Sequence, residues 1–199
     1  MLVAALPGST AHAALSTLPY VHDGTACQST SGTHNLPSGM SQTGVAFDGS
    51  RLLLSCWGDT TITAVDPVSG AELQVYAVSG KGLTGNPIRA FGALAYDRAS
   101  GTLWACASYS TSAKTERNSV EVGIVTLSSG GTGTYTPEFN SKGCINGLAV
   151  DPGTATGRAG TLWTSANIAT SMYEYSGLPT PGKQIGSAVN VGGLIGYNS

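Results

Sequence analysis

The sequence predicts an all-β fold. Glycine accounts for 28 of the 199 residues and only 10% of the residues are charged, a composition that favours a chain with many turns. No stretch keeps apolar residues at helical spacing, whereas short apolar runs that end in turn residues recur along the chain. Because 41% of the residues are hydrophobic, the chain can still form a core. We therefore expect short antiparallel strands joined by tight turns.

Residues 1–13 are interpreted as the back part of a secretion signal. An apolar run at 2–6 is followed by a Pro-Gly pair and by Ala11-His12-Ala13, the small-x-small pattern that precedes signal cleavage. No Lys or Arg precedes Arg51, so the basic start of such a signal is missing, as a late start codon or a truncated gene would explain. We expect a secreted or cell-surface protein. The alternative is a frayed apolar N-terminus of a cytosolic protein.

One pattern of apolar runs occurs three times. The motifs Val-Ala-Phe-Asp, Leu-Ala-Tyr-Asp and Leu-Ala-Val-Asp end at Asp48, Asp97 and Asp151, at a spacing of about 50 residues that is typical of propeller blades. Each motif is followed by a turn that contains glycine and then by two further short runs. The second runs lie at 52–56, 103–107 and 162–166, and the third runs at 62–66, 120–125 and 172–175.

A fourth run completes the first repeat. Leu73, Val75 and Ala77 alternate there with Glu72, Gln74 and Tyr76, which predicts a strand. We expect consecutive four-stranded antiparallel blades near 43–80, 93–137 and 147–191. A closed propeller takes roughly four to eight blades, so the three within 43–191 predict an incomplete ring, with 192–199 as the start of a further blade. Residues 14–42 are either an outer strand or a surface segment.

Three segments carry a family resemblance. Gly44–Asp48, Trp57–Asp59 and Ile62–Pro67 resemble a blade of the NHL, YVTN and gluconolactonase-like β-propellers. The resemblance implies the architecture but no activity, because one such fold hosts many functions.

The segment that begins at Asn146 resembles the Asn-Gly-Leu-Ala stretch by which gluconolactonase-like propellers offer an amide oxygen to a metal. Hard cations need about six oxygen ligands, and the entry positions of the first two repeats, Thr43 and Gly92, supply no acidic residue. We therefore expect no cofactor, with Ca²⁺ or another divalent metal at Asn146 as the weaker hypothesis and an Asn-Gly turn as its alternative.

A ligand site is predicted where the loops meet. In a blade, the loop into the first strand and the loop between the second and third strands lie at the same end, where propeller ligands usually bind. Aromatic, amide and carboxylate side chains there can stack on and hydrogen-bond a polar ring. The candidate ligand-binding residues are Trp57, Asp59, Tyr109, Asn146 and Asn167. The alternative for Trp57 is packing between blades, and we expect Trp104 and Trp163 to be core residues.

The four cysteines predict two disulfides in an exported chain. The loop that contains Cys144 enters the third repeat at the end where the second strand of the second repeat finishes, so we expect Cys144 to pair with Cys106. Cys27 would then pair with Cys56. Buried free thiols are the alternative.

Several function classes lack support. Lys and Arg number 9 against 11 Asp and Glu and are scattered, which disfavours nucleic acid as a partner, and no apolar run is long enough for a membrane span. His12, His22 and His34 all precede the first repeat, so no catalytic residues are predicted in the repeats. The Asp that closes each motif is expected to cap its own turn rather than act as acid or base.

We therefore expect an extracellular binding module for a glycan, a peptide or a surface protein. Two alternatives stay open. One is a lactonase-like or lyase-like propeller enzyme with part of its active site in other blades, and the other is a purely structural surface repeat.

Overall fold

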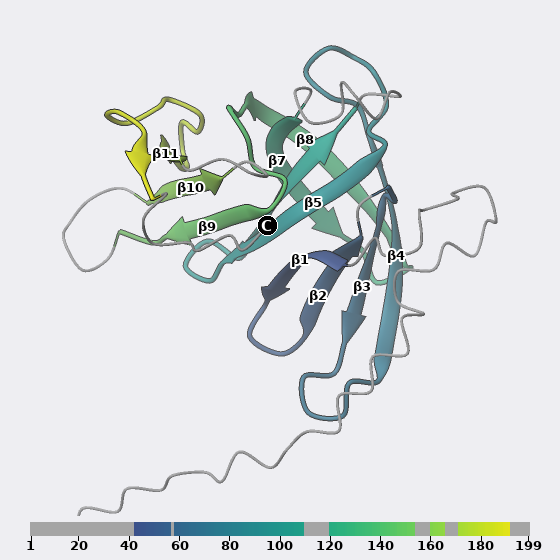
Figure 1. Ribbon diagram of the computed structural model, residues 1–199. Helices are drawn as coiled ribbons and strands as arrows, with labels where there is room; N and C mark the ends of the chain where they lie inside the picture. The colour runs from purple at the N-terminus through teal and green to yellow at the C-terminus, as the bar shows by residue number, and fades with distance from the viewer. Residues whose placement is uncertain (1–41, 57, 110–119, 154–159, 166–170, 192–199) are drawn as a thin grey trace, which may run out of the picture.

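The computed structural model describes residues 42–56, 58–109, 120–153, 160–165 and 171–191. These residues form twelve strands and contain no helix (Figure 1), so the prediction of an all-β chain is confirmed. The strands are β1 (Gln42–Phe47), β2 (Leu52–Cys56), β3 (Thr61–Val65), β4 (Glu72–Gly80), β5 (Ala90–Asp97), β6 (Thr102–Ser108), β7 (Val120–Leu127), β8 (Thr132–Asn140), β9 (Gly147–Asp151), β10 (Thr161–Ser165), β11 (Ser171–Ser176) and β12 (Val189–Asn190).

The strands follow one another as three sets of four, β1–β4, β5–β8 and β9–β12. Within each set, every strand pairs in antiparallel fashion with the next one along the chain. Tight turns make this possible, and the Asp that ends each repeated motif forms its turn. The Oδ1 atoms of Asp48, Asp97 and Asp151 accept hydrogen bonds from the backbone N–H two residues later, at 2.8, 2.9 and 2.9 Å. The expected turn-capping role of these residues is confirmed.

The first two sets are joined, which differs from the separate four-stranded units that the sequence predicts. β4 and β8 pair in parallel from Ala77–Gly80 to Thr132–Tyr135, so the first eight strands form one mixed sheet in the order β1-β2-β3-β4-β8-β7-β6-β5. Both strands are the last of their set, and each therefore has a free edge that can accept a neighbour. Glycine lets them approach, since a Cβ on Gly80 would lie 2.5 Å from the carbonyl oxygen of Tyr135.

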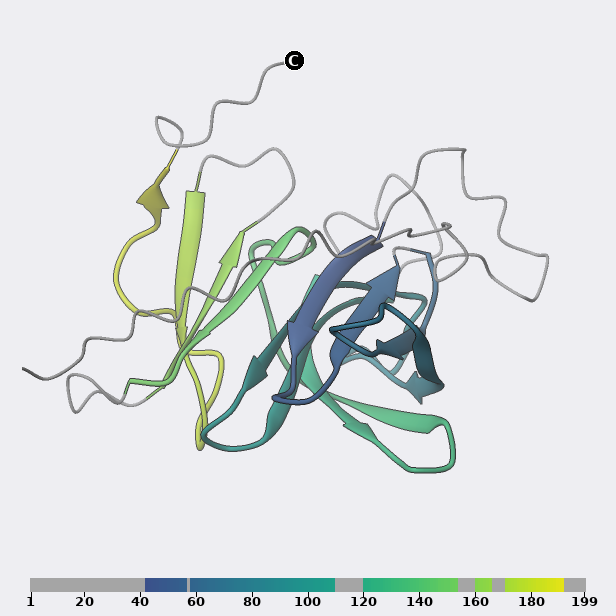
Figure 2. The same ribbon diagram turned by 90° about the horizontal axis from the view of Figure 1, so that it is seen from below.

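The first strands of the three sets lie beside one another, with β5 in contact with both β1 and β9 (Figure 2). Backbone atoms meet there: a Cβ on Gly44 would lie 2.5 Å from the carbonyl oxygen of Gly92. The Ser55 hydroxyl donates to that same oxygen at 2.6 Å, and the N–H of Ala93 donates to the carbonyl of Ile145 at 2.8 Å. These contacts hold the beginnings of the three sets together.

Two cores fill the spaces between the sets. The first core packs Leu53, Ile62 and Tyr76 of the first set against residues of the second set that include Phe91 and Tyr135. The second core lies between the second and third sets and has Trp104, Val122, Phe139, Leu162 and Tyr175 among its members.

The two strand tryptophans differ in burial. Trp104 is 2% exposed, as expected of a core residue, but Trp163 is only half-buried. The expectation for Trp163 was therefore wrong. Leu162 faces the second set, so Trp163 lies on the opposite face of β10, whereas the equivalent face of β6, which carries Trp104, is covered by the third set.

A disulfide bond joins Cys106 in β6 to Cys144 in the segment before β9, with a Cα–Cα distance of 5.6 Å. This is the pair expected from the shared end of the strands. Cys56 is also disulfide-bonded, and Cys27, its expected partner, lies outside the described residues.

Candidate functional site

Three of the five predicted ligand-binding residues can be located. Asp59, Tyr109 and Asn146 are described, whereas Trp57 and Asn167 lie outside the described residues. Asp59 follows β2, Tyr109 follows β6 and Asn146 precedes β9. All three lie at the end of the sheets where β1, β5 and β9 begin, which we call the loop end. The opposite end, where these strands finish at Phe47, Asp97 and Asp151, is the turn end.

Local hydrogen bonds fix Asp59. Its carboxylate accepts a bond from the backbone N–H of Thr61 at 3.1 Å, and its own N–H donates to the carbonyl of Cys56 at 3.2 Å. Its carbonyl oxygen accepts from the N–H of Phe91 at 3.0 Å, which ties this loop to the start of β5. The half-buried carboxylate keeps acceptor capacity for a ligand.

Asn146 is exposed at the loop end, next to the buried Cys144 and Ile145. The disulfide and the bond from Ala93 to Ile145 hold its backbone in place. No cluster of three or more His, Cys, Asp or Glu residues that could hold a metal occurs in the described part of the chain. No described hydrogen bond joins the side chains of Asp59, Tyr109 and Asn146.

Tyr109 lies beside a buried carboxyl group that the sequence analysis missed. A Cβ on Gly82 would lie 3.0 Å from Cδ1 of Tyr109 and 2.8 and 2.9 Å from Oε1 and Oε2 of Glu121. The segment after β4 therefore crosses directly over the Glu121 carboxyl, with the Tyr109 ring next to it. Glu121 interrupts the apolar run Val120–Val125, and this single charged residue in a core strand was the available signal.

Glu121 is fully buried, at 0% exposure. Its Oε2 accepts a hydrogen bond from the N–H of Leu83 at 2.9 Å. The buried hydroxyl of Tyr135 lies close to the same carboxyl group and interacts with it, although neither this hydroxyl nor Oε1 makes a hydrogen bond of good geometry. Burial raises the pKa of Glu121, against the opposing effects of the bond from Leu83 and of the Tyr135 hydroxyl. Burial and the nearby Glu121 charge likewise raise the pKa of the Tyr135 hydroxyl.

This arrangement anchors a loop rather than presenting a reactive group. The Leu83 bond holds the segment between β4 and β5 over the carboxyl, and the contact with Gly82 leaves no room for a ligand atom. A second bond, from the N–H of Gly82 to the carbonyl of Asn86 at 2.8 Å, closes the same loop on itself. Glu121 thus supports the surface on which Tyr109 lies.

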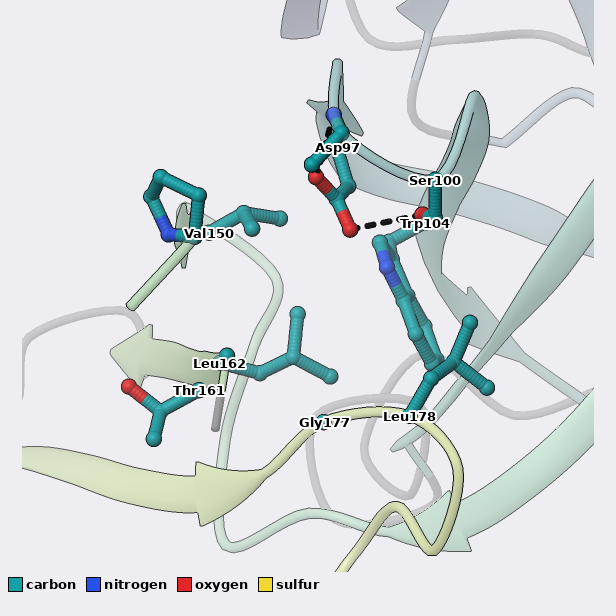
Figure 3. Close-up of a pocket in the computed structure, with 11 residues that line it drawn as sticks. Asp97, Ser100, Trp104, Val150, Thr161, Leu162, Gly177 and Leu178 are labelled. Atoms are coloured by element: carbon teal, nitrogen blue, oxygen red, sulfur yellow. Dashed lines mark hydrogen bonds between the residues drawn. The ribbon is translucent and has the colours of Figure 1, made fainter. Parts of the chain in front are cut away.

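Two pockets lie at the turn end, opposite to the predicted ligand face. The first cleft, of about 320 Å³, separates the first and second strand sets and is lined by residues that include Asp48, Arg51, Leu53 and Leu103. The second cleft, of about 250 Å³, separates the second and third sets. In Figure 3, Asp97 and Trp104 form one side of the second cleft, and Val150 and Leu162 form the other.

The two clefts occupy corresponding places in the repeat. Asp48 and Leu53 contribute to the first cleft as Asp97 and Trp104 contribute to the second. The register of the strands supports this correspondence, because Phe47 pairs with Leu52 in the first set as Tyr96 pairs with Leu103 in the second.

No protein-family model matches the chain, and a search of curated proteins also finds no match. Within the ranges that the structure describes, no helix has the length and apolar character needed to cross a membrane.

Proposed function

We propose that the chain is a β-propeller-type repeat protein of the NHL, YVTN and gluconolactonase-like kind that works outside the cytoplasm as a binding module. Its partner is a glycan, a peptide or a surface protein, and the loop end is the contacting surface. The Cys106–Cys144 disulfide is typical of proteins that fold in an oxidising compartment.

The side-by-side packing of β1, β5 and β9 is the observation that carries the proposal. In a propeller the first strands of the blades surround the axis, so the loops that precede them gather at one end. Three antiparallel sets with cores between them fit that plan. The parallel pairing of β4 with β8 is an addition to it, since it links the last strands of neighbouring blades.

The apolar outer face of the first set, which is exposed on its edge strands β1 and β4 and buried on its central strands β2 and β3, also favours repeat packing. Val45 and Phe47 on β1 and Leu73 and Val75 on β4 are 56, 44, 51 and 38% exposed. They alternate with residues of the first core, such as Ala46 and Tyr76, and so belong to the opposite face of the sheet. An apolar sheet face of this kind is the surface that a neighbouring blade covers in a propeller.

The loop end offers the chemistry of a recognition surface. Tyr109 provides a half-buried aromatic ring, Asp59 an acceptor and Asn146 an exposed amide, and loops held on a sheet scaffold are common sites of binding.

An array of defined oligosaccharides and a phage-displayed peptide library, each probed with the full chain, test the proposal. We expect a ligand whose affinity falls by about 1–3 kcal/mol when Trp57 or Tyr109 is replaced by alanine, as for central aromatic anchors. Val68→Ser is the matched control, because Val68 is 73% exposed at the turn end. Absence of any ligand on both screens, or a ligand that ignores both aromatic substitutions, would refute the proposal.

A further inference from the structure

The outer face of the first strand set is the face turned away from the second set. One row of this face runs through consecutive partners in the strand register, namely Val45, Leu54, Thr63 and Val75. Leu53 and Ala64, the neighbours of Leu54 and Thr63 along β2 and β3, belong to the first core. Because side chains alternate along a strand, the row lies on the opposite side of the sheet from that core.

The centre of the outer face is buried, whereas its margins are exposed. Leu54 and Val65 on the central strands are 3% and 5% exposed, but Val45 and Val75 are 56% and 38% exposed. Leu54 and Val65 nevertheless belong to neither of the two cores. The packing between strand sets therefore does not account for the burial of these two side chains.

Cys56 lies on the same face. It follows Leu54 by two residues on β2, and the residue between them, Ser55, points inward and donates to the carbonyl oxygen of Gly92. Cys56 is 4% exposed and is disulfide-bonded, so another part of the chain is attached to the outer face at this point.

The partner of Cys56 follows from the count of cysteines. The chain contains four, Cys106 and Cys144 are bonded to each other, and the remaining cysteine is Cys27. Gln42, at the start of β1, is the Cα partner of Cys56. A bond between Cys27 and Cys56 therefore closes the stretch between Cys27 and Gln42 into a loop, and the residues before Cys27 leave from the outer face.

Residues 14–26, which we call the N-terminal segment, have a composition suited to an apolar surface. Their large apolar side chains are Leu15, Leu18, Tyr20 and Val21, and the single Asp, Glu, Lys or Arg among them is Asp23. At about 3.3 Å per residue the extended segment reaches about 40 Å, whereas four neighbouring strands span about 15 Å. A segment that starts at Cys56 is thus long enough to cross the whole face.

We propose that the N-terminal segment packs on the outer face of the first strand set and is tethered there by a disulfide between Cys27 and Cys56. Its apolar side chains cover the centre of the face and the exposed margins at Val45 and Val75. The segment thereby takes the place on this face that a neighbouring blade would occupy. This packing does not depend on what the loop end binds.

Peptide mapping of the full chain without reduction tests the tether. No Lys or Arg precedes Arg51, so trypsin leaves Cys27 in the peptide that ends at Arg51 and Cys56 in the next one. We expect these two peptides to remain linked until a reductant is added. Their separation without reduction would overturn the proposal.

Photo-crosslinking tests the position of the N-terminal segment. The photoreactive residue p-benzoylphenylalanine in place of Leu18 or Tyr20 should crosslink to β1–β4 within the same chain, at residues of the outer face. The control is the same probe in place of Leu178, an exposed apolar residue of the third set, which should give no crosslink to that face. Crosslinks from Leu18 and Tyr20 to other parts of the chain, or between two copies, would overturn the proposal.

A pair of substitutions tests the cover itself. In NMR spectra recorded with a soluble gadolinium chelate, the relaxation of the Val45 and Val75 methyl groups should increase severalfold when Leu18 and Tyr20 are both replaced by serine. Leu36→Ser, the same change between Cys27 and Gln42, is the matched control and should leave both rates unchanged.

The methyl groups of Val68, which is 73% exposed in the turn after β3, should relax equally in the wild type and in each variant. They report whether the chelate acts uniformly on the samples. Methyl groups of Val45 and Val75 that relax as fast in the wild type as in the double variant would show that the segment does not cover the face, and would overturn the proposal.

Discussion

Replacing Glu121 by glutamine should stabilise the protein at neutral pH. The wild-type carboxyl is fully buried, and the N–H of Leu83 is the backbone donor that it accepts from. Glutamine has nearly the same shape, keeps an oxygen for Leu83 and keeps a polar group beside the Tyr135 hydroxyl, which interacts with the wild-type carboxyl. The substitution therefore removes a buried charge and retains the bond that anchors the loop.

The direction of the pH dependence follows from the raised pKa of Glu121. A group whose pKa is higher in the folded than in the unfolded protein favours folding in its protonated form. This contribution is complete below the ordinary value of 4.5 and is lost as the pH rises through the raised folded pKa. The gain from Glu121→Gln should therefore be absent in acid and appear as the pH rises to neutrality.

The size of the gain can be bounded. An unsatisfied buried polar group costs about 1–3 kcal/mol, and about 1 kcal/mol corresponds to roughly 2–4 °C in the melting temperature of a chain of this length. Thermal and urea unfolding of the wild type and Glu121→Gln across the pH range measure it. The control is Glu72→Gln at an exposed position on β4, which should change stability by less than about 0.5 kcal/mol. A stability difference that is independent of pH, or a loss of stability at neutral pH, would refute the reasoning.

Three further predictions follow from the same contacts. Gly82→Ala should destabilise the chain by about 1–3 kcal/mol and speed amide exchange at Leu83, because the new Cβ meets both Glu121 oxygens. Gly130→Ala is the control, because a Cβ at that position has no atom within 4 Å. Replacing Cys106 and Cys144 by serine should cost about 2–5 kcal/mol in denaturant unfolding, and an unchanged midpoint would contradict the disulfide. Burial opposes the ionisation of Asp48, but hydrogen bonds from Arg51 and Ser50 lower its pKa to about 2. Arg51→Met should therefore raise that pKa toward 3.8 in an NMR titration. It should also reduce the stability that the protein loses as the pH falls from 3.8 toward 2.

The strands could be predicted because their signals are local. An apolar run closed by Asp and glycine needs only its own residues to form a strand and a turn, and the bonds at Asp48, Asp97 and Asp151 are made within their own turns. The disulfide between Cys106 and Cys144 was also accessible, because strand direction alone brings their ends together.

The remaining features depend on contacts between strand sets, which no local pattern contains. In β4 the apolar alternation of Leu73 and Val75 suggests an inward face, yet these residues are exposed and Tyr76 is buried. The opposite face turns inward because Tyr76 joins the first core and its hydroxyl accepts from Arg51. The parallel pairing of β4 with β8 likewise joins segments about 55 residues apart, a separation that hairpin rules do not address.

The first two turn aspartates show how a repeat can keep one residue while the turn around it changes. Oδ1 of Asp48 and Oδ1 of Asp97 each accept a hydrogen bond from the backbone N–H two residues later. The turns nevertheless differ, because the N–H of Asp48 donates to the carbonyl of Arg51, whereas the carbonyl of Asp97 accepts from the N–H of Gly101. The strand register shows that the second turn is also two residues longer. An aspartate at the end of an apolar run therefore predicts that a turn forms there, but the length of the turn and the side chains around it depend on the neighbouring residues.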